Sequence, residues 1–327
     1  MGQTRKNKII FYGDIAIDVM IETDLLPQVI PDTSVRDVNI RPGGSSANSA
    51  VVASHLNLDA YYMGLIGDDI FRDLLIKDLK DNHVKLDLLR QVHGKNTFVF
   101  AVVNKKGESK FFSYRGVNGL QDYGEIADDI SKPFDCIHIS GYCLQDQPSR
   151  ETAVRLIRDA QEQQTLVTLD PSFHFSTSDH VKDQAFLSQF DIIMPNLEEA
   201  CFMTGEKDVA TAARIIRQMG AKIMVIKMGA DGCFLSYQQN DLFIHAYPVD
   251  NVINTIGAGD AFCAGFLCGF LNGLQPEQAA RIGNAAAHIT LSGAGGHEHA
   301  PTLDEVLQLI ADKDNIDLSN AFETDRS

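Results

Sequence analysis

The chain alternates short apolar runs with stretches in which apolar residues recur every three or four positions. The runs are bounded by Gly, Pro, Asp or Asn, as is typical of strands buried on both faces; they span 8–13, 60–67, 134–140, 165–170, 191–196 and 221–229. Helical spacing falls between many of them, as at 71–82, 150–163 and 210–220. This alternation predicts an α/β protein whose mainly parallel sheet is flanked by helices.

Two segments break this pattern. "NTFVFAVVNKKGESKFFSYRG" (96–116) indicates a hairpin around a polar turn, and "VIPDTSVRDVNIRPGG" (29–44) indicates another extended piece. We therefore expect a small β lid, built from about 15–42 and 95–118 and inserted into a single domain spanning 1–327. Thr302 and Glu305 form a predicted capping box, after which the polar segment 314–327 is expected to be disordered.

Composition narrows the classes of partner. Hydrophobic residues make up 44% of the 327 residues, and the formal net charge of -16 argues against a nucleic-acid-binding surface and against an anionic membrane. The six cysteines contain no C-x-x-C pair and indicate buried thiols in a reducing compartment. The apolar run near the start is too short for a signal peptide, so we expect a cytoplasmic protein.

Several common enzyme motifs are missing from the sequence. There is no G-x-x-x-x-G-K-S/T loop, no G-x-G-x-x-G after the first strand, no H-E-x-x-H and no G-x-S-x-G. The nearest histidine pair, His297 and His299, lacks metal-site spacing and is expected at the surface. Nicotinamide-dependent oxidoreduction is disfavoured because its glycine fingerprint is absent.

The stretch "NTIGAGDAFCAGF" (254–266) places Gly257 and Gly259 directly before an apolar helix. The glycines allow a tight turn, and such a turn also leaves backbone N–H groups free at the positive end of the helix dipole, where an anion binds. Asp260 lies in the first turn, so it could act as a general base, and the helix N-terminus predicts a low pKa for it.

A second glycine-led helix occurs in "RPGGSSANSAVVASHL" (41–56). Gly43 and Gly44 would let a ligand approach the backbone, and Asn48 could point its amide at hydroxyl groups. Taken alone, the stretch favours a helix capped by Ser45 or Ser46 over a ligand site.

Two further motifs end strands at the edge where open α/β sheets bind ligands. In "MPNLEEACFMTG" (194–205), Asn196 and Glu199 would face the cleft and organise hydrated Mg²⁺, although Glu199 could be a solvated helix charge. In "VIKMGADGCFL" (225–235), Lys227 lies near the edge before a glycine turn. A turn without any ligand explains this stretch equally well. Together with Asp260 and the free amides, these features suit the transfer of phosphate to an alcohol.

The motifs "GGSSANSA", "PNLEEA" and "NTIGAGDAF", in this order, resemble the signatures of the ribokinase-like, or PfkB, carbohydrate kinases, and the resemblance runs from about Lys8 to Val306. It implies a ribokinase-like three-layer sandwich with a β lid, and an ATP- and Mg²⁺-dependent kinase. It also implies a catalytic group, a substrate group and a cofactor group. The catalytic group is Asp260 with Gly257, Ala258 and Gly259. The substrate group is Asp18, Gly43, Gly44 and Asn48. The cofactor group is Asn196, Glu199, Lys227, Gly229, Gly232, Thr255 and Asn284.

Two departures from the family pattern matter. Asn254 stands where the signature usually opens with Asp, which removes a carboxylate near the family's monovalent-cation site and argues against K⁺ activation. "LDPSFHF" (169–175) resembles the D-x-N-x-R stretch of ketodeoxygluconate kinases but carries Ser172 and His174. Arg115 in the lid hairpin could still meet a substrate carboxylate or phosphate.

We therefore expect transfer of the γ-phosphoryl group of ATP to a primary hydroxyl of a small sugar, of the ribose, fructose or ketodeoxy sugar acid type. A nucleoside kinase on the same fold and a non-catalytic sugar or nucleotide sensor stay open as alternatives. An exposed lid edge predicts a homodimer through the β lid.

Overall fold

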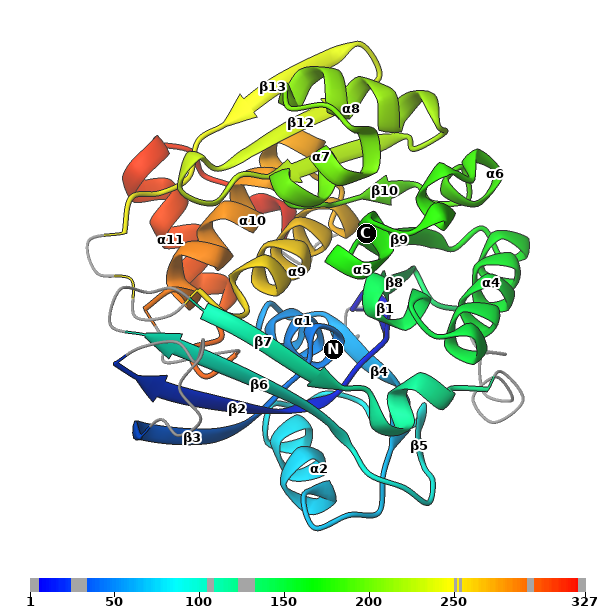
Figure 1. Ribbon diagram of the computed structural model, residues 1–327. Coiled ribbons are helices and arrows are strands. Elements are labelled where there is room, and N and C mark those ends of the chain that lie inside the picture. The colour runs from blue at the N-terminus through cyan, green and yellow to red at the C-terminus, as the bar shows by residue number, and fades with distance from the viewer. Residues whose placement is uncertain are drawn as a thin grey trace, which may run out of the picture.

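The computed structural model describes residues 6–24, 34–104, 109–122, 133–249, 252, 255–292 and 297–322. Its strands form two sheets (Figure 1). The larger has the order β13-β12-β11-β10-β9-β8-β1-β4-β5 and is parallel except for β12 and β13. Its strands are β1 (Lys8–Tyr12), β4 (Asp59–Ile66), β5 (Leu89–Gln91), β8 (Cys136–Ser140), β9 (Leu166–Asp170), β10 (Ile192–Ile193), β11 (Ile223–Lys227), β12 (Cys233–Tyr237) and β13 (Asn240–Ile244).

Helices cover both faces of this sheet, which confirms the expected α/β class (Figure 1). Ile9 and Phe11 of β1 belong to one apolar core, with α1, α2, α9, α10 and α11, whereas Ile10 and Tyr12 belong to a second core with α4, α7 and α8. The helices are α1 (Ser45–His55), α2 (Arg72–Asp81), α4 (Gln147–Glu162), α5 (Phe173–Ser176), α6 (Gln184–Leu187), α7 (Leu197–Thr204), α8 (Val209–Gln218), α9 (Ala258–Leu271), α10 (Pro276–Thr290) and α11 (Leu303–Asp314).

The helix that carries the Gly-Ala-Gly-Asp turn lies deep in the molecule. Residues 261–269 of α9 are all buried, and α9 packs closely on α10. A Cβ atom on Gly265 would lie 2.9 Å from the Cβ of Ala286, so a small residue is needed at this crossing. This packing holds the N-terminus of α9 at a fixed place.

The two segments expected to form a lid contribute one four-stranded sheet with the order β3-β2-β6-β7. Its strands are β2 (Ala16–Thr23), β3 (Val35–Gly43), β6 (Thr97–Asn104) and β7 (Ser109–Tyr114). β6 and β7 pair antiparallel, so the expected hairpin strands are confirmed, and 25–33 and 105–108 lie outside the described residues. In Figure 1 this sheet lies below the larger sheet, next to α1 and α2.

Short 3₁₀ turns complete the described chain: η1 (Gly116–Leu120), η3 (Gly141–Leu144), η4 (Asp179–Lys182), η5 (Gly229–Asp231) and η6 (Ser319–Ala321). The Thr302–Glu305 capping box at α11 is confirmed. The expectation of a disordered tail from 314 is wrong for 315–322, because Leu318 is buried in the core beside α11; 323–327 lie outside the described residues. Among the described residues, no helix has both the length and the apolar character to cross a bilayer.

Candidate active site

Polar residues gather at the carboxyl edge of the parallel strands. The strand order places β4 on one side of β1 and β8 on the other, so the chain changes direction in the sheet at β1. Asp14 follows β1, and Ser140 ends β8 and donates to it at 3.4 Å. Asp170 and Lys227 end β9 and β11. Ligands of open α/β sheets bind at such a switch point.

The N-terminus of α9 faces this edge. Gly257 is its N-cap in the left-handed conformation (φ 86°), which explains why a glycine is needed there. The N–H groups of Gly259 and Asp260 lie in the first turn, before any helical carbonyl can reach them. A Cβ on Gly259 would lie 3.5 Å from Nζ of Lys227, so an ammonium group lies beside this turn. The turn therefore has the form of an anion site.

Asp260 is held by two side chains of α1. Its Oδ1 accepts a hydrogen bond from Oγ of Ser45 at 2.7 Å, and its Oδ2 accepts one from Nδ2 of Asn48 at 2.8 Å. Burial, with a contribution from Asp170, raises the pKa of Asp260 to about 7, although the bonds from Asn48 and Ser45 and the charge of Lys227 lower it. The expected low pKa is wrong, because loss of water around the carboxylate outweighs the hydrogen bonds and the positive charge that favour its ionised form.

The alternative interpretation of Ser45 and Ser46 as helix caps is also wrong. The N-cap of α1 is Gly44, and no side chain caps it. The Ser45 hydroxyl reaches Asp260 instead, 215 positions along the chain. Asn48 is 3% exposed and likewise bonds Asp260, so its expected role toward a substrate stays a prediction.

Lys227 lies in a buried ion pair. Its Nζ is 2.6 Å from Oδ1 of Asp170 and 3.5 Å from Sγ of Cys263. Burial alone lowers the pKa of Lys227, but the carboxylates of Asp170 and Glu199 and the hydrogen bond to Asp170 more than compensate and raise it. The ammonium therefore stays charged next to the anion turn.

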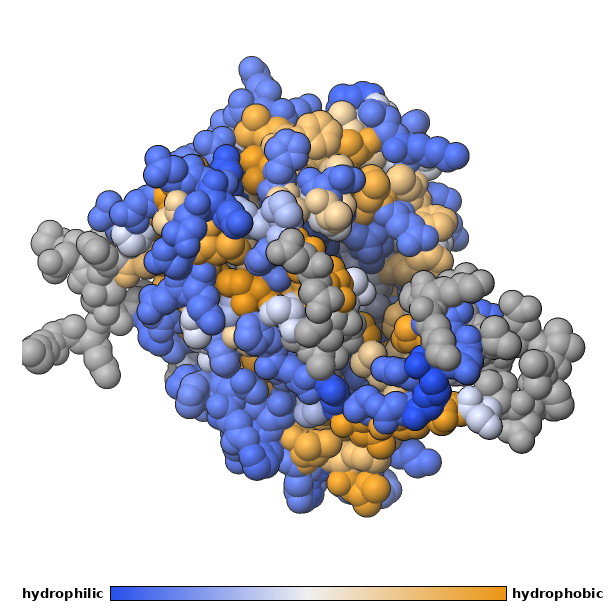
Figure 2. Space-filling view, turned by 90° about the vertical axis from the view of Figure 1, so that its left-hand side faces the viewer, coloured by the Kyte–Doolittle hydropathy of each residue, from blue (hydrophilic) through white to orange (hydrophobic). Residues whose placement is uncertain are grey.

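An apolar pocket of about 490 Å³ opens beside the Gly-Ala-Gly-Asp turn. Phe262, Ala287 and Leu291 line it, as do six of the residues expected on the cofactor side: Asn196, Lys227, Gly229, Gly232, Thr255 and Asn284. The Asn284 amide donates to the carbonyls of Ile244 and His245 at 3.1 Å each and so shapes the wall. Figure 2 shows apolar surface in the middle of this face of the molecule.

Glycines make this wall possible. Gly232 has φ 94°, and a Cβ atom there would lie 2.1 Å from the carbonyl oxygen of Ile244, so no other residue fits. Gly229 begins η5 with φ 59°. The backbone itself thus forms the pocket surface at this turn.

Asn196 and Glu199 form a reciprocal capping box at α7. Oδ1 of Asn196 accepts from the N–H of Glu199 at 2.8 Å, and Oε2 of Glu199 accepts from the N–H of Asn196 at 2.9 Å. Glu199 is buried rather than a solvated helix charge, and burial, followed by the charge of Asp170, raises its pKa. Among the described residues, no three His, Cys, Asp or Glu side chains converge as a metal-binding cluster.

Carboxylates dominate the part of the candidate site that faces the small sheet. A Cβ atom on Gly43 would lie 2.1 Å from Oδ2 of Asp18, so the glycine leaves room for this carboxylate. Burial and the charges of Asp14 and Asp260 raise the pKa of Asp18 to about 7, and His297 lowers it. Gly44 has φ 99°. The three acidic groups suit a ligand rich in hydrogen-bond donors.

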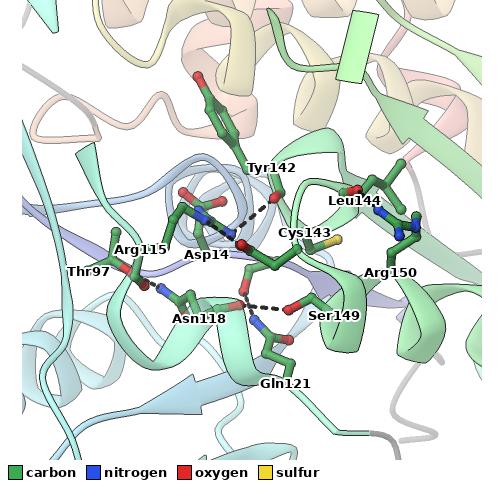
Figure 3. A network of polar contacts seen from close by, with 12 residues as sticks. Asp14, Thr97, Arg115, Asn118, Gln121, Tyr142, Cys143, Leu144, Ser149 and Arg150 are labelled. Carbon is green, nitrogen blue, oxygen red and sulfur yellow. Dashed lines mark hydrogen bonds and ion pairs between the residues drawn. The ribbon is translucent and has the colours of Figure 1, made fainter. Parts of the chain in front are cut away.

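Arg115 anchors the base of the small sheet rather than its tip. Its Nε pairs with Oδ2 of Asp146 at 3.1 Å, and its Nη2 donates to the carbonyl of Tyr142 at 3.0 Å. Figure 3 shows this network, with the Tyr142 ring pointing away from it. Asn118 and Gln121 donate to the carbonyls of Ile15 and Gly13, and among the described groups their own side-chain oxygens have no partner.

Sequence reasoning missed four contributors to this arrangement: Asp14, Ser45, Asp170 and His297. Asp170 ends a buried strand, so the rule that found Asn196 could have found it. The expectation that His297 lies at the surface is wrong, because its side chain is buried and bonds Asn48. His299 is exposed as expected. Asn254 lies outside the described residues, so the expectation about K⁺ stays a prediction.

The doubly wound sheet, the small four-stranded sheet and the Gly-Ala-Gly-Asp turn define a kinase-like α/β protein. Residues 6–303 match the pfkB family of carbohydrate kinases. The chain belongs to this family and is a carbohydrate kinase.

Curated relatives and solved structures span nearly the whole chain. It is 25% identical to the ATP-dependent 6-phosphofructokinase of Thermoanaerobacterium thermosaccharolyticum, covering 92% of this chain and 93% of the relative. It is 29% identical to the 5-dehydro-2-deoxygluconokinase of Clostridium perfringens, covering 94% of each. Its fold matches that of Arabidopsis thaliana ribokinase complexed with ribose and ATP, with TM-score 0.82, 22% identity, and 93% of this chain and 98% of that chain covered. The ribokinase-like fold is therefore confirmed.

Proposed function

We propose that the protein transfers the γ-phosphoryl group of ATP to a primary hydroxyl of a small sugar. One observation carries the proposal: the Asp260 carboxylate and the Lys227 ammonium both lie at the first turn of α9, between an apolar pocket and the carboxylates of Asp14 and Asp18. An alcohol and the end of a nucleotide can meet only where such surfaces adjoin.

Asp260 accepts the proton of the attacking hydroxyl. Ser45 and Asn48 hold its two oxygens, so the carboxylate is oriented before the substrate arrives. A pKa of about 7 leaves much of it ionised near neutral pH while keeping it basic enough to take a proton. Asp18 holds sugar hydroxyls from the side of the small sheet.

Backbone amides and a charged side chain surround the proposed position of the transferring phosphoryl group. The amides of Gly259 and Asp260 and the ammonium of Lys227 stabilise the negative charge on the transferring group. Mg²⁺, when bound with ATP, would supply further charge neutralisation. The Glu199 carboxylate, which uses Oε2 in its capping box, is the group suited to hold a water bound to the metal.

The proposed substrate is a small sugar, and its identity within that class is open to test. The two relatives named above act on a phosphorylated sugar and a sugar acid by their names. We propose Arg115, which pairs with Asp146 here, as the cation for such a group. A nucleoside is the rival acceptor. A screen of ADP release over pentoses, hexoses, sugar phosphates, ketodeoxy acids and nucleosides would name the acceptor.

The Asp260→Asn variant tests the assignment directly. We expect turnover to fall roughly 100- to 10,000-fold with ATP affinity nearly unchanged, because the base acts in the transition state. Sugar-dependent ADP release and an ATP titration measure the two effects. A near-normal rate would refute the role of Asp260, and a wild type that binds sugar but never releases ADP would establish the sensor instead.

We also propose a homodimer through the small sheet, in the cytoplasm. The face turned away from Asp18 carries five exposed apolar side chains: Val38, Ile40, Phe100, Phe112 and Tyr114. Figure 2 shows apolar surface along the lower margin of the molecule. The free cysteines support a reducing compartment.

A further inference from the structure

His297 lies between α10 and α11 and bridges two other helices. Its Nδ1 is 2.8 Å from Oδ1 of Asn48 in α1, and its Nε2 is 2.8 Å from Oδ2 of Asp78 in α2. Its side chain is only 6% exposed. A buried histidine with a partner on each nitrogen has a defined ring orientation.

The partners determine where the hydrogens are. Asn48 gives an N–H to the Asp260 carboxylate, so its amide oxygen is the atom that faces His297. Nδ1 must therefore carry a hydrogen and donate it. Nε2 faces the carboxylate of Asp78, which holds the other side of the ring.

The segment around His297 is anchored independently. Glu298 forms an ion pair with Arg41 of β3, and Thr302 caps α11 a few residues later. His297 is thus held against α1 from the small sheet and from the C-terminal helix. Its charge is felt at the substrate side, where it opposes the burial that raises the pKa of Asp18.

We propose that His297 is a positioning residue of the kinase reaction, which fixes the amide of Asn48 so that its N–H group holds the Asp260 carboxylate in place. Without a donor at position 297, the Asn48 amide can turn over and present its oxygen to Asp260, which repels the carboxylate. The inference rests on the proposed role of Asp260. Loss of such a supporting bond typically costs about 10- to 100-fold in rate.

Two substitutions of similar size separate the hydrogen bond from packing. In His297→Met no donor remains, and we expect kcat to fall roughly 10- to 100-fold with the KM for ATP within about twofold of wild type. His297→Gln keeps a donor, and its kcat should recover to within about fivefold of wild type. His299→Met, at the exposed neighbouring histidine, is the matched control and should leave kcat unchanged. Equal melting temperatures for the two His297 variants exclude a folding effect.

A spectroscopic measurement on the wild type needs neither turnover nor a variant. Nitrogen-15 NMR of the imidazole groups should show a hydrogen on Nδ1 of His297, and Asn48→Ala should shift the Nδ1 signal. A bare Nδ1, or a wild-type kcat in a folded His297→Met, would overturn the inference. If Asp260→Asn keeps full turnover, the proposed function fails instead, and the role of His297 in the reaction falls with it.

Discussion

At the scale of single residues, the site is controlled by burial as much as by residue type. Asp18 and Asp260 are ordinary carboxylates in the sequence, yet burial raises the pKa of each to about 7. The hydrogen bonds from Ser45 and Asn48 favour the ionised form of Asp260 but do not offset the lost hydration. The carboxylate that a helix N-terminus would make acidic is therefore basic enough to accept a proton.

This predicts a pH dependence of the reaction. Because Asp260 must be ionised to act as a base, kcat/KM for the sugar should rise with pH, reach half its maximum near pH 7 and level off about one unit higher. Initial rates between pH 5.5 and 9 at constant ionic strength measure it. Asp18 titrates in the same range, so the apparent values belong to the interacting carboxylates together. A flat profile from pH 6 to 8 would contradict the raised pKa values.

The same pKa shifts make the folded state less stable as pH rises. Each carboxyl group has a pKa in the folded state above its usual value near 3.8. The stability it contributes is therefore fully present below about pH 4 and is lost as pH rises through about 7. The acidic site groups thus lower stability at the pH where the reaction needs them ionised.

At the scale of elements, the N-terminus of α9 joins the two halves of the site. Its first turn supplies the amides and Asp260, and its buried body packs on α10, so the amides cannot move away from Lys227. Gly259 keeps the space between the amides and the ammonium open. Glycine is therefore needed at position 259 so that a ligand can reach the amides, and not because the backbone is strained.

Gly259→Ala tests this interpretation. The new methyl group would lie 3.5 Å from Nζ of Lys227, which is an ordinary contact. We therefore expect the free energy of unfolding to be unchanged or to rise by at most about 1 kcal/mol. The methyl group would occupy space needed by a phosphoryl group, so kcat/KM for ATP should fall roughly 100-fold or more. Thermal unfolding and steady-state kinetics measure the two quantities. Unchanged kinetics would argue that phosphate does not enter this turn.

At the scale of the whole molecule, the two sheets have different tasks. The large sheet is buried on both faces by two apolar cores and carries Asp170 and Lys227 at the ends of its strands. The small sheet turns Asp18 toward the site and leaves Phe100 and Phe112 exposed on its other face. Large exposed apolar patches on a sheet are typical of protein contacts.

Phe112→Glu tests the proposed dimer. Phe112 is 61% exposed, so the charge costs little in an isolated chain but would be buried in a dimer. We expect the wild type to elute as a dimer and the variant as a monomer in size-exclusion chromatography with light scattering. Val154→Glu on α4, which is 41% exposed, is the matched control. A wild type that stays monomeric at micromolar concentration would contradict the proposal.

The sequence by itself determined most of the elements and the motifs they carry. Strands buried on both faces and helices with a periodic apolar side leave strong local patterns, so the parallel sheet, the hairpin strands of the small sheet and the capping box at α11 could be predicted. The Gly-Ala-Gly-Asp turn was recognisable because glycine and aspartate at these positions serve a local backbone purpose.

Only the tertiary structure decided which groups face one another. Ser45 bonds Asp260 rather than capping α1, His297 reaches Asn48 rather than water, and Lys227 pairs with Asp170. These contacts join residues far apart in the chain, and no local pattern encodes them. The pKa of Asp260 has the same origin, because it depends on the water removed and the charges brought near when the chain folds.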